Sequence, residues 1–408
     1  MGIGIGLVGL GGFGQAFADL FRSHPLVDRV ALCDREPERM EAVASRPGWD
    51  KKFNRRDMYT RLEDVLETPL DAVAIITQPW LHAPQCIQAM ETGKDVYSAV
   101  PVISVPDGDE ILQWCSDLIE VCQRTGRRYM LGETTYYHPE TMFCRRKAAE
   151  GAFGDFVYAE GEYFHDVDSS ECSLRDVRSA RLDGQAGREW PLALERYRNA
   201  GIKDGPMHYP THSVSGPASV MGARALRVTA YGYANHNNDP FFEDDAFSNE
   251  VALFQMSNGA TVRICEFREL AGSLHQSETF RIVGTRGTFN DGMWKENFRS
   301  APFTAKPLKT TRLTDEAMRD PLPSEVALAF KRIKRPEAVD GSDFTPEGHR
   351  GSHPYLVHEF VDAVANDRQP AIHIWKAARY MAMGVTAHKS ALKKGETLDV
   401  PDFGDPPA

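Results

Sequence analysis

A glycine-rich turn near the N-terminus narrows the possible folds of this 408-residue chain more than any other segment. Its residues, Gly9-Leu10-Gly11-Gly12-Phe13-Gly14, fit the pattern G-x-G-x-x-G. The apolar run Ile3–Val8 before it predicts a buried strand, and the apolar spacing of Phe13–Ser23 after it predicts a helix. Glycines in this position allow a tight turn and let backbone N–H groups approach a diphosphate at the helix N-terminus. The turn therefore predicts a dinucleotide-binding βαβ unit.

A carboxylate and a guanidinium follow the second predicted strand, Val30–Cys33. Asp34 lies 20 residues after Gly14, which is the distance at which a carboxylate accepts a hydrogen bond from a ribose 2′-hydroxyl. Arg35 could meet a 2′-phosphate, or it could be a solvated surface charge. Because Asp34 would repel that phosphate, the sequence favours NAD as the cofactor over NADP.

Short strand-like and helix-like segments alternate through the first third of the chain. The further strand-like segments are Ala72–Ile76, Asp95–Ser98 and Arg128–Leu131. The further helix-like segments are Pro37–Ala44, Pro84–Glu91, Asp107–Arg124 and a stretch through Leu66 that opens with the capping-box pattern Thr60-x-x-Glu63. Such alternation predicts an α/β unit with a doubly wound parallel sheet. We expect it to occupy residues 1–134.

The pattern changes after residue 135, where longer strands follow one another. They are predicted at Phe156–Phe164, Leu226–Tyr233, Glu250–Met256, Thr261–Phe267 and Glu278–Val283. Their period-2 alternation predicts a second α/β domain, residues 135–350, with an open, mainly antiparallel sheet. The polar stretches 168–206 and 297–350 are interpreted as loops with short helices, some of them covering the site. Residues 351–408 are expected to form helices that pack back on the core.

Composition excludes several classes of function. The chain has 47 Lys and Arg against 58 Asp and Glu, a net charge of -11, which disfavours binding to nucleic acids and to anionic membranes. It contains no apolar stretch of the roughly 18 residues needed to span a bilayer. The seven cysteines form no CxxC pair, so a cytoplasmic location fits best.

Further motifs resemble those of one family. They are Thr77-Gln78-Pro79-Trp80-Leu81-His82, Gly93-Lys94-Asp95-Val96-Tyr97 and the segment around His212. Over nearly its whole length the chain resembles the Gfo/Idh/MocA oxidoreductases, which pair a Rossmann domain with an α/β domain built on an open sheet. The resemblance implies oxidation or reduction of a sugar or cyclitol with NAD(P), and pairing through the open sheet into a homodimer or homotetramer. The implied cofactor-binding residues are Gly9, Gly11, Gly12, Phe13, Gly14, Asp34, Arg35, Thr77, Trp80 and His82.

The chain departs from the common pattern of that family at two places. Most members carry Glu-Lys-Pro after the fifth strand, where the Lys assists hydride transfer, but this chain has Ala99-Val100-Pro101. Many members carry Asp four residues before the catalytic His, and here that residue is His208. The run Tyr209-Pro210-Thr211-His212, with Glu133 and Tyr163-x-His165, instead resembles the branch that contains glycoside hydrolase family 109. That branch also lacks the Lys, although it keeps a Glu where this chain has Ala99.

The resemblance assigns roles to polar residues beyond the nucleotide motif. His212 is the expected base for the substrate hydroxyl, because an imidazole titrates near neutral pH. Tyr209 would bond or relay that proton, and Glu133 or His165 would protonate a leaving group. Tyr163, Arg198 and His208 are expected to bind substrate, and His353, Tyr355 and His358 resemble positions that approach the site. Packing or surface roles remain open for Tyr209 and Arg198.

A metal centre is not expected. His165, Asp166, His208 and His212 are ligand types, and the two last are spaced four residues apart. Pro210 lies between them, however, and interrupts a continuous helix. No HExxH or comparable signature is present in the sequence.

The first hypothesis is an NAD-dependent oxidoreductase that acts on a secondary hydroxyl of a sugar, sugar derivative or cyclitol. The first alternative is an NAD-dependent glycoside hydrolase that oxidises C3, eliminates the aglycone, adds water and re-reduces the product. The second alternative is a non-catalytic dinucleotide-binding regulator, which the absence of the Lys would allow. The expected partner is thus a small carbohydrate, with neither nucleic acid nor membrane involved.

Overall fold

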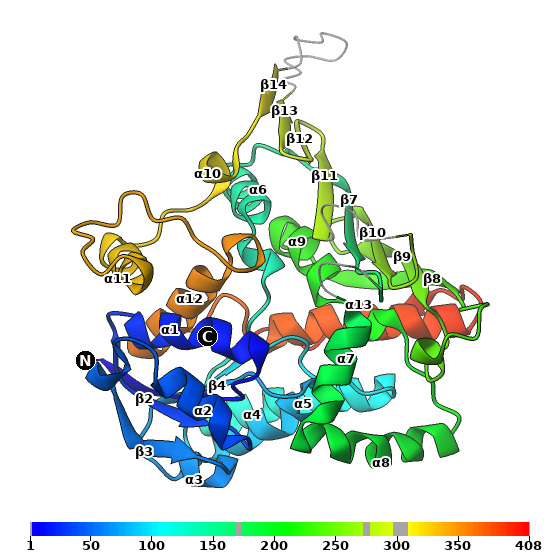
Figure 1. Cartoon of the computed structure of the whole chain (residues 1–408). Coiled ribbons are helices and arrows are strands. Elements are labelled where there is room, and N and C mark those ends of the chain that lie inside the picture. The colour runs from blue at the N-terminus through cyan, green and yellow to red at the C-terminus, as the bar shows by residue number, and fades with distance from the viewer. Residues whose placement is uncertain (1, 169–172, 272–277, 297–308, 408) are drawn as a thin grey trace.

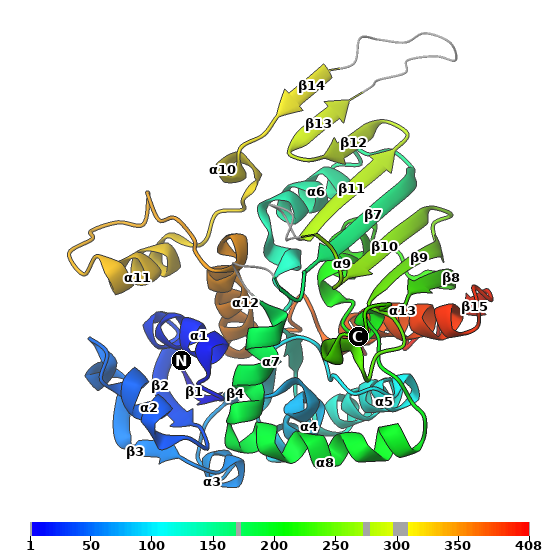
Figure 2. The same ribbon diagram turned by 45° about the vertical axis from the view of Figure 1, so that its right-hand side comes forward.

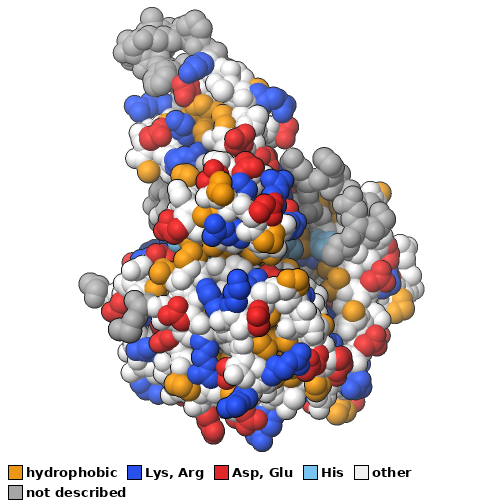
Figure 3. Space-filling model, turned by 60° about the vertical axis from the view of Figure 1, so that its left-hand side comes forward, with side chains coloured by type: hydrophobic (Ala, Val, Ile, Leu, Met, Phe, Trp, Pro, Cys, Tyr) orange, Lys and Arg blue, Asp and Glu red, His pale blue; other side chains and the backbone are white. Residues whose placement is uncertain are grey.

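Two sheets, one above the other in Figure 1, make up the framework of the molecule, and helices fill the space between and around them. The structure is a computed structural model that describes residues 2–168, 173–271, 278–296 and 309–407. Within these residues no helix is long and apolar enough to cross a membrane. On the face shown in Figure 3, acidic and basic side chains are interspersed.

The N-terminal sheet has six parallel strands in the order β3-β2-β1-β4-β5-β6. They are β1 (Ile3–Val8), β2 (Val27–Cys33), β3 (Phe53–Tyr59), β4 (Ala72–Ile75), β5 (Asp95–Ser98) and β6 (Tyr129–Leu131). Parallel strands are buried on both faces, which is why β1 and β4 consist of apolar residues and glycine. Strand β3 was not predicted, because it lies at the sheet edge and most of its side chains reach solvent.

Helices flank this sheet as the alternating pattern predicted. They are α1 (Gly12–Ser23), α2 (Pro37–Ala44), α3 (Leu62–Leu66), α4 (His82–Glu91) and α5 (Gly108–Thr125). The Thr60-x-x-Glu63 capping box was wrong: α3 begins after Arg61 and no side chain caps it. Helix α5, in contrast, is capped by Asp107, whose side chain accepts a hydrogen bond from the Asp109 N–H.

The second sheet has nine strands in the order β14-β13-β12-β11-β7-β10-β9-β8-β15. They are β7 (Phe156–Phe164), β8 (Ala225–Tyr233), β9 (Asn249–Met256), β10 (Thr261–Phe267), β11 (Glu278–Gly284), β12 (Gly287–Asn290), β13 (Met293–Glu296), β14 (Lys309–Arg312) and β15 (Leu398–Asp399). Among the described strand pairings of this second sheet, only that of β7 with β10 is parallel. The predicted fold class, a doubly wound parallel sheet followed by an open and mainly antiparallel one, is therefore confirmed.

One face of the second sheet is covered by helices and the other is open (Figure 2). Helices α6 (Pro139–Ala149) and α9 (Thr211–Met221) lie on the covered face. Helix α9 packs so closely on β7 that a Cβ on Gly161 would lie 1.9 Å from the carbonyl oxygen of Ser213. This close approach fixes the position of α9, which carries His212.

The stretch 168–206 differs from the prediction of loops with short helices. It forms a hairpin of two regular helices, α7 (Leu174–Asp183) and α8 (Gln185–Asn199). Both views place α8 beside α4 and α5 of the first sheet. Helix α7 has no buried residue and α8 buries only Gly187 and Tyr197, so neither has the apolar stripe that reveals a helix in sequence. In the other stretch, β14, α10 (Asp315–Met318) and α11 (Ser324–Lys334) are regular elements as well.

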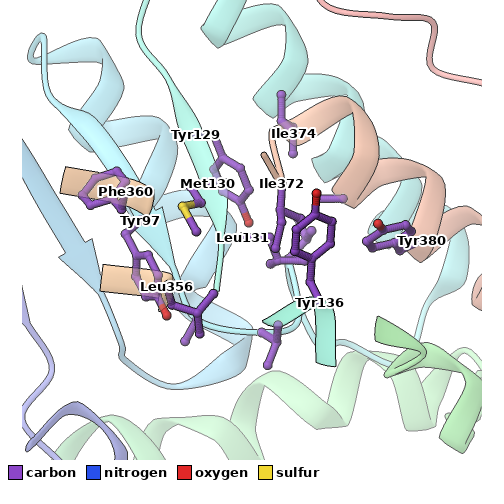
Figure 4. Close-up of a cluster of buried hydrophobic side chains, with 14 of the residues drawn as sticks. Tyr97, Tyr129, Met130, Leu131, Tyr136, Leu356, Phe360, Ile372, Ile374 and Tyr380 are labelled. Carbon is purple, nitrogen blue, oxygen red and sulfur yellow. The ribbon is translucent and has the colours of Figure 1, made fainter. Parts of the chain in front are cut away.

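The C-terminal helices connect the two sheets. Helix α12 (His353–Ala365) packs against α1, and α13 (Ile374–Leu392) packs against both α5 and β8. The segment that joins α12 to α13 runs beside β6. There the Leu131 N–H donates to the Ile372 carbonyl at 2.9 Å. Figure 4 shows the resulting apolar cluster, formed by Tyr97, Tyr129, Met130, Leu131, Tyr136, Leu356, Phe360, Ile372, Ile374 and Tyr380. Burial of these apolar side chains fixes the two sheets and the helices between them relative to one another.

Candidate active site

A cleft of about 1900 Å³ lies between the N-terminal sheet, the α7–α8 hairpin and α9. Its lining includes the glycine turn, the residues after β4 and β5, and the polar residues of β7 and α9. Single-ligand pockets usually measure about 300–1,000 Å³. The cleft is therefore large enough for a dinucleotide and a second, smaller molecule.

The glycine turn has the geometry of a diphosphate cradle. Gly9 has φ +89°, and a Cβ there would lie 2.3 Å from the Ile76 carbonyl oxygen. A Cβ on Gly14 would lie 1.9 Å from the Gly9 carbonyl oxygen, so these two positions require glycine. Gly11 and Gly12 face open space instead, and the first turn of α1 carries no acidic residue. A diphosphate can therefore approach the N-terminus of α1 without meeting a side chain or a negative charge.

Asp34 stabilises the glycine turn through hydrogen bonds to the backbone. Its carboxylate is 6 % exposed and accepts hydrogen bonds from the Leu10 N–H at 2.6 Å and the Glu36 N–H at 2.9 Å. Arg39 lies 3.6 Å away. Each carboxylate oxygen has two lone pairs, so Asp34 retains acceptor capacity for a ribose hydroxyl. The described residues at the predicted nucleotide position thus fit NAD.

Thr77, Trp80 and His82 also line the cleft, and they follow β4. His82 is buried, and its Nδ1 and Nε2 lie 2.8 and 3.2 Å from the carbonyl oxygens of Pro101 and Thr77. Burial lowers the pKa of His82 to about 4. A neutral imidazole has one N–H, so His82 donates to one of these two carbonyls, and its buried ring forms part of the wall. Trp80 stacks on Trp190 of α8, with ring centroids 4.5 Å apart.

His212, which lines the cleft, forms a buried pair with Glu133 behind it. His212 Nδ1 lies 3.0 Å from Glu133 Oε1 and 4.0 Å from Glu278 Oε1. Burial would lower the pKa of His212, but the two carboxylates outweigh it and raise that pKa to about 9. Burial would likewise raise the pKa of Glu133, but the His212 charge lowers it. At neutral pH the pair is therefore an imidazolium and a carboxylate, with His212 Nε2 left for a ligand.

Tyrosines surround His212. The rings of Tyr163 and Tyr209 have their centroids 4.9 and 5.4 Å from that of His212. The Tyr163 hydroxyl lies 2.5 Å from His165 Nδ1, and the Tyr209 hydroxyl donates to the Val100 carbonyl at 3.4 Å. Burial raises the pKa of both phenols, so both are neutral donors at physiological pH. The structure therefore brings together four of the residues predicted to be catalytic, His212, Glu133, Tyr209 and His165.

Two of the predicted substrate-binding residues, His208 and Arg198, have polar partners within the protein. His208 is 2 % exposed, its Nδ1 lies 2.7 Å from Asp204 Oδ1, and its ring packs on His388. It is absent from the described lining of the cleft, so a substrate-binding role for His208 stays a prediction. Arg198 does line the cleft but pairs with Glu243 and Asp244.

His349 is a cleft residue that was not predicted from the sequence. It is exposed to the cleft, its Nδ1 lies 3.0 Å from His353 Nε2, and its ring centroid lies 5.4 Å from that of Phe13 in the glycine turn. Burial lowers the pKa of His349, and the charges of Glu278 and His212 act on that pKa as well. The backbone is left-handed at four successive residues, Gly348 to Gly351, with φ +39° at His349. Such a conformation is unfavourable for non-glycine residues and is typical of functional sites.

The three C-terminal residues expected near the site do not line the cleft. His353 stands behind His349 and packs on Phe17, with ring centroids 4.2 Å apart. Tyr355 donates its hydroxyl to the Asp320 carbonyl. His358 lies 3.1 Å from His24. Two glycines flanking a histidine, Gly348 and Gly351, were the signal in the sequence that could have located His349.

The walls of the cleft near His212 differ from the usual pattern of the resembled family. Ala99 and Val100 line the cleft, so no lysine amine reaches it from this strand end. Among the described lining residues, every permanent cation is an arginine. Because arginine does not exchange its proton at physiological pH, histidines are the basic groups here that can move one.

Comparison with known proteins agrees with this geometry. Residues 3–133 match the model of the GFO_IDH_MocA oxidoreductase family with an NAD-binding Rossmann fold. An alpha-N-acetylgalactosaminidase of Tannerella forsythia is 26% identical over 410 residues, covering 92% of this chain and 80% of that protein. A glycosyl hydrolase family 109 protein of Saccharopolyspora erythraea is 26% identical over 424 residues, covering 98% of this chain and 83% of its own length.

Solved structures share the fold along the whole chain. A levoglucosan dehydrogenase in complex with NADH and levoglucosan has a TM-score of 0.70 at 18% identity and covers 98% of this chain and 100% of its own. The myo-inositol 2-dehydrogenase of Lactobacillus plantarum has a TM-score of 0.66 at 15% identity, with the same two coverages. The resemblance seen in the sequence is thus confirmed: residues 3–133 match the oxidoreductase family model, and the relatives that span most of the chain are an alpha-N-acetylgalactosaminidase and glycosyl hydrolase family 109 proteins.

Proposed function

We propose that this protein is an NAD-dependent enzyme that acts on a secondary hydroxyl of a sugar, sugar derivative or cyclitol. The observation that carries the proposal is that the glycine turn and His212, which pairs with the buried Glu133, line the same cleft. A dinucleotide and a proton-transfer group can therefore meet at one substrate. NADH-bound structures of the same fold, such as that of levoglucosan dehydrogenase, support this placement.

His212 is the residue that would exchange the hydroxyl proton. When bound, NAD would supply the hydride acceptor, and the base must take the proton that the alcohol loses. Because the pKa of His212 is raised to about 9, its neutral, accepting form becomes abundant only in alkaline solution. Tyr209 and Tyr163 would orient the substrate through their neutral hydroxyl groups.

A redox-neutral glycoside hydrolase is the second candidate, and a specific feature favours it. Elimination of an aglycone requires a base for the C2 proton and an acid for the leaving oxygen, besides the group that serves the oxidised hydroxyl. The cleft offers His212 with Glu133 on one side, Tyr163 with His165 beside them, and His349 on the wall that contacts the glycine turn. The alpha-N-acetylgalactosaminidase relative supports this candidate.

Three finer properties belong to the same proposal. NAD is favoured over NADP because Asp34 stands where a 2′-phosphate would lie. The open sheet face, where Tyr231, Tyr233 and Leu253 are 64%, 49% and 49% exposed, is the surface we expect to pair two copies into a homodimer, or four into a homotetramer. The six described cysteines are all free and buried, which fits a cytoplasmic location.

One experiment separates the candidates. Purified protein is incubated with NAD and either free sugars or aryl glycosides, while reduced nicotinamide and released aglycone are followed by absorbance. Net NADH formation with free sugars supports the dehydrogenase. Aglycone release with only a trace of NAD supports the glycosidase. Binding of NAD without either signal would refute both and leave the non-catalytic regulator.

A further inference from the structure

Helix α8 brings a carboxylate to the position that distinguishes NAD from NADP. Arg35 directly follows Asp34 after β2, and its Nη1 donates to both carboxylate oxygens of Glu189, at 3.0 and 3.1 Å. A guanidinium in this position is the group that accommodates a 2′-phosphate in NADP-binding domains. Here a carboxylate from the second half of the chain already neutralises it. Both side chains line the cleft.

Two contacts on either side of Glu189 hold it in place. The Gln185 N–H, at the start of α8, donates to Glu36 Oε1 at 3.1 Å. Trp190 stacks on Trp80 with an angle of 15° between the ring planes. Glu189 lies between these anchors on the same helix, so the helix itself delivers the carboxylate to Arg35. An exposed ion pair is usually worth little, but here the rigid elements, and not the pair, determine the position.

The charges around this point oppose a phosphate. Three carboxylates, those of Asp34, Glu36 and Glu189, stand against two guanidinium groups, those of Arg35 and Arg39. A phosphate monoester would add about two further negative charges. Without Glu189 the balance would be even, and Arg35 would have no anionic partner from α8.

We propose that Glu189 is a specificity-determining residue, which excludes NADP by occupying Arg35. The α7–α8 hairpin thus acts on the cofactor as well as covering the cleft. This inference rests on the proposed function only in requiring that the cleft binds a nicotinamide dinucleotide, and not on what reaction follows.

The test measures dissociation constants of NAD and NADP by titration calorimetry, which needs no turnover. In Glu189→Gln we expect the Kd of NADP to fall at least about tenfold and that of NAD to change by less than about threefold. Glu195→Gln removes the same charge from an exposed position six residues further along α8 and should change neither constant. Adding Arg35→Ala to Glu189→Gln should abolish the gain in NADP affinity.

Each other result counts against the proposal. An unchanged NADP affinity in Glu189→Gln, with NAD still bound, would mean that Arg35 is not restrained by Glu189. A parallel loss of both affinities would mean that Glu189 only supports the hairpin. Failure of the wild-type protein to bind either dinucleotide would overturn the proposed function itself, and this inference with it.

Discussion

Replacing Glu133 by Gln isolates the charge that controls His212. The pKa of His212 stands at about 9 against an ordinary value of 6.5, a difference worth about 3 kcal/mol in the balance between its protonation states. Glu133 is the nearest carboxylate, at 3.0 Å, and Glu278 stands 1 Å further away. A neighbouring opposite charge at this range contributes about 1–3 pH units. In Glu133→Gln the pKa of His212 should fall by that amount, because only the more distant Glu278 and Glu266 named among its raising charges then offset burial.

Two measurements check this. NMR titration of the His212 imidazole reports the pKa directly, without turnover. In steady-state oxidation, kcat/KM should rise with pH up to about pH 9 in the wild type, and the same limb should lie about 1–3 pH units lower in Glu133→Gln. Glu162→Gln is the control, since Glu162 pairs with Arg263 on the open face of the sheet. An imidazole titration in Glu133→Gln within about half a pH unit of the wild type would refute the assigned role of Glu133.

Three further predictions follow from the same contacts. Gly14→Ala places a methyl group 1.9 Å from the Gly9 carbonyl, so NAD binding measured by calorimetry should be lost while circular dichroism shows a folded protein; retained binding would contradict the cradle. His349→Asn keeps a residue that tolerates the left-handed backbone but removes the imidazole, so kcat should fall at least about tenfold with the Kd of NAD nearly unchanged; weaker NAD binding would instead make His349 a cofactor contact. Because the pKa of His212 is higher in the fold than in the unfolded chain, its contribution to stability is complete below pH 6.5 and lost as the pH rises to about 9. The free energy of unfolding in urea should decrease across that interval by about 2–3 kcal/mol more in the wild type than in His212→Asn, and equal slopes would exclude the ion pair.

Local patterns sufficed where each element carries its own signal. The glycine pattern predicted the turn, the spacing from Gly14 predicted the place of Asp34, and apolar runs predicted the buried strands. Strand β3 and helices α7 and α8 were missed because their side chains mostly face solvent, and a polar element has no periodic apolar face to read. They are held by contacts with distant segments, such as Trp190 on Trp80.

The site divides in the same way. Glu133, Tyr163, Tyr209 and His212 could be proposed because they stand in motifs. His208 was proposed from its position four residues before His212, whereas its contacts with Asp204 and His388 depend partly on a distant helix that the motif does not include. His349 and Glu189 reach the cleft from segments about 140 residues and about 25 residues from His212, and such approaches depend on tertiary packing that a single sequence does not encode locally.

The position of the His212–Glu133 pair links proton transfer to the closure of the cleft. Glu133 follows β6 of the first sheet, whereas His212 belongs to α9, which lies on the second sheet and is held there by its contact with Gly161. The contribution of Glu133 to the raised pKa of His212 therefore exists only while the two sheets keep this arrangement. Any movement that separates them would remove the partner charge and return His212 toward its ordinary pKa, releasing a proton. The apolar cluster around Tyr97, Tyr129 and Phe360 resists that movement. The same packing that builds the cleft thus sets the protonation state in which His212 meets its substrate.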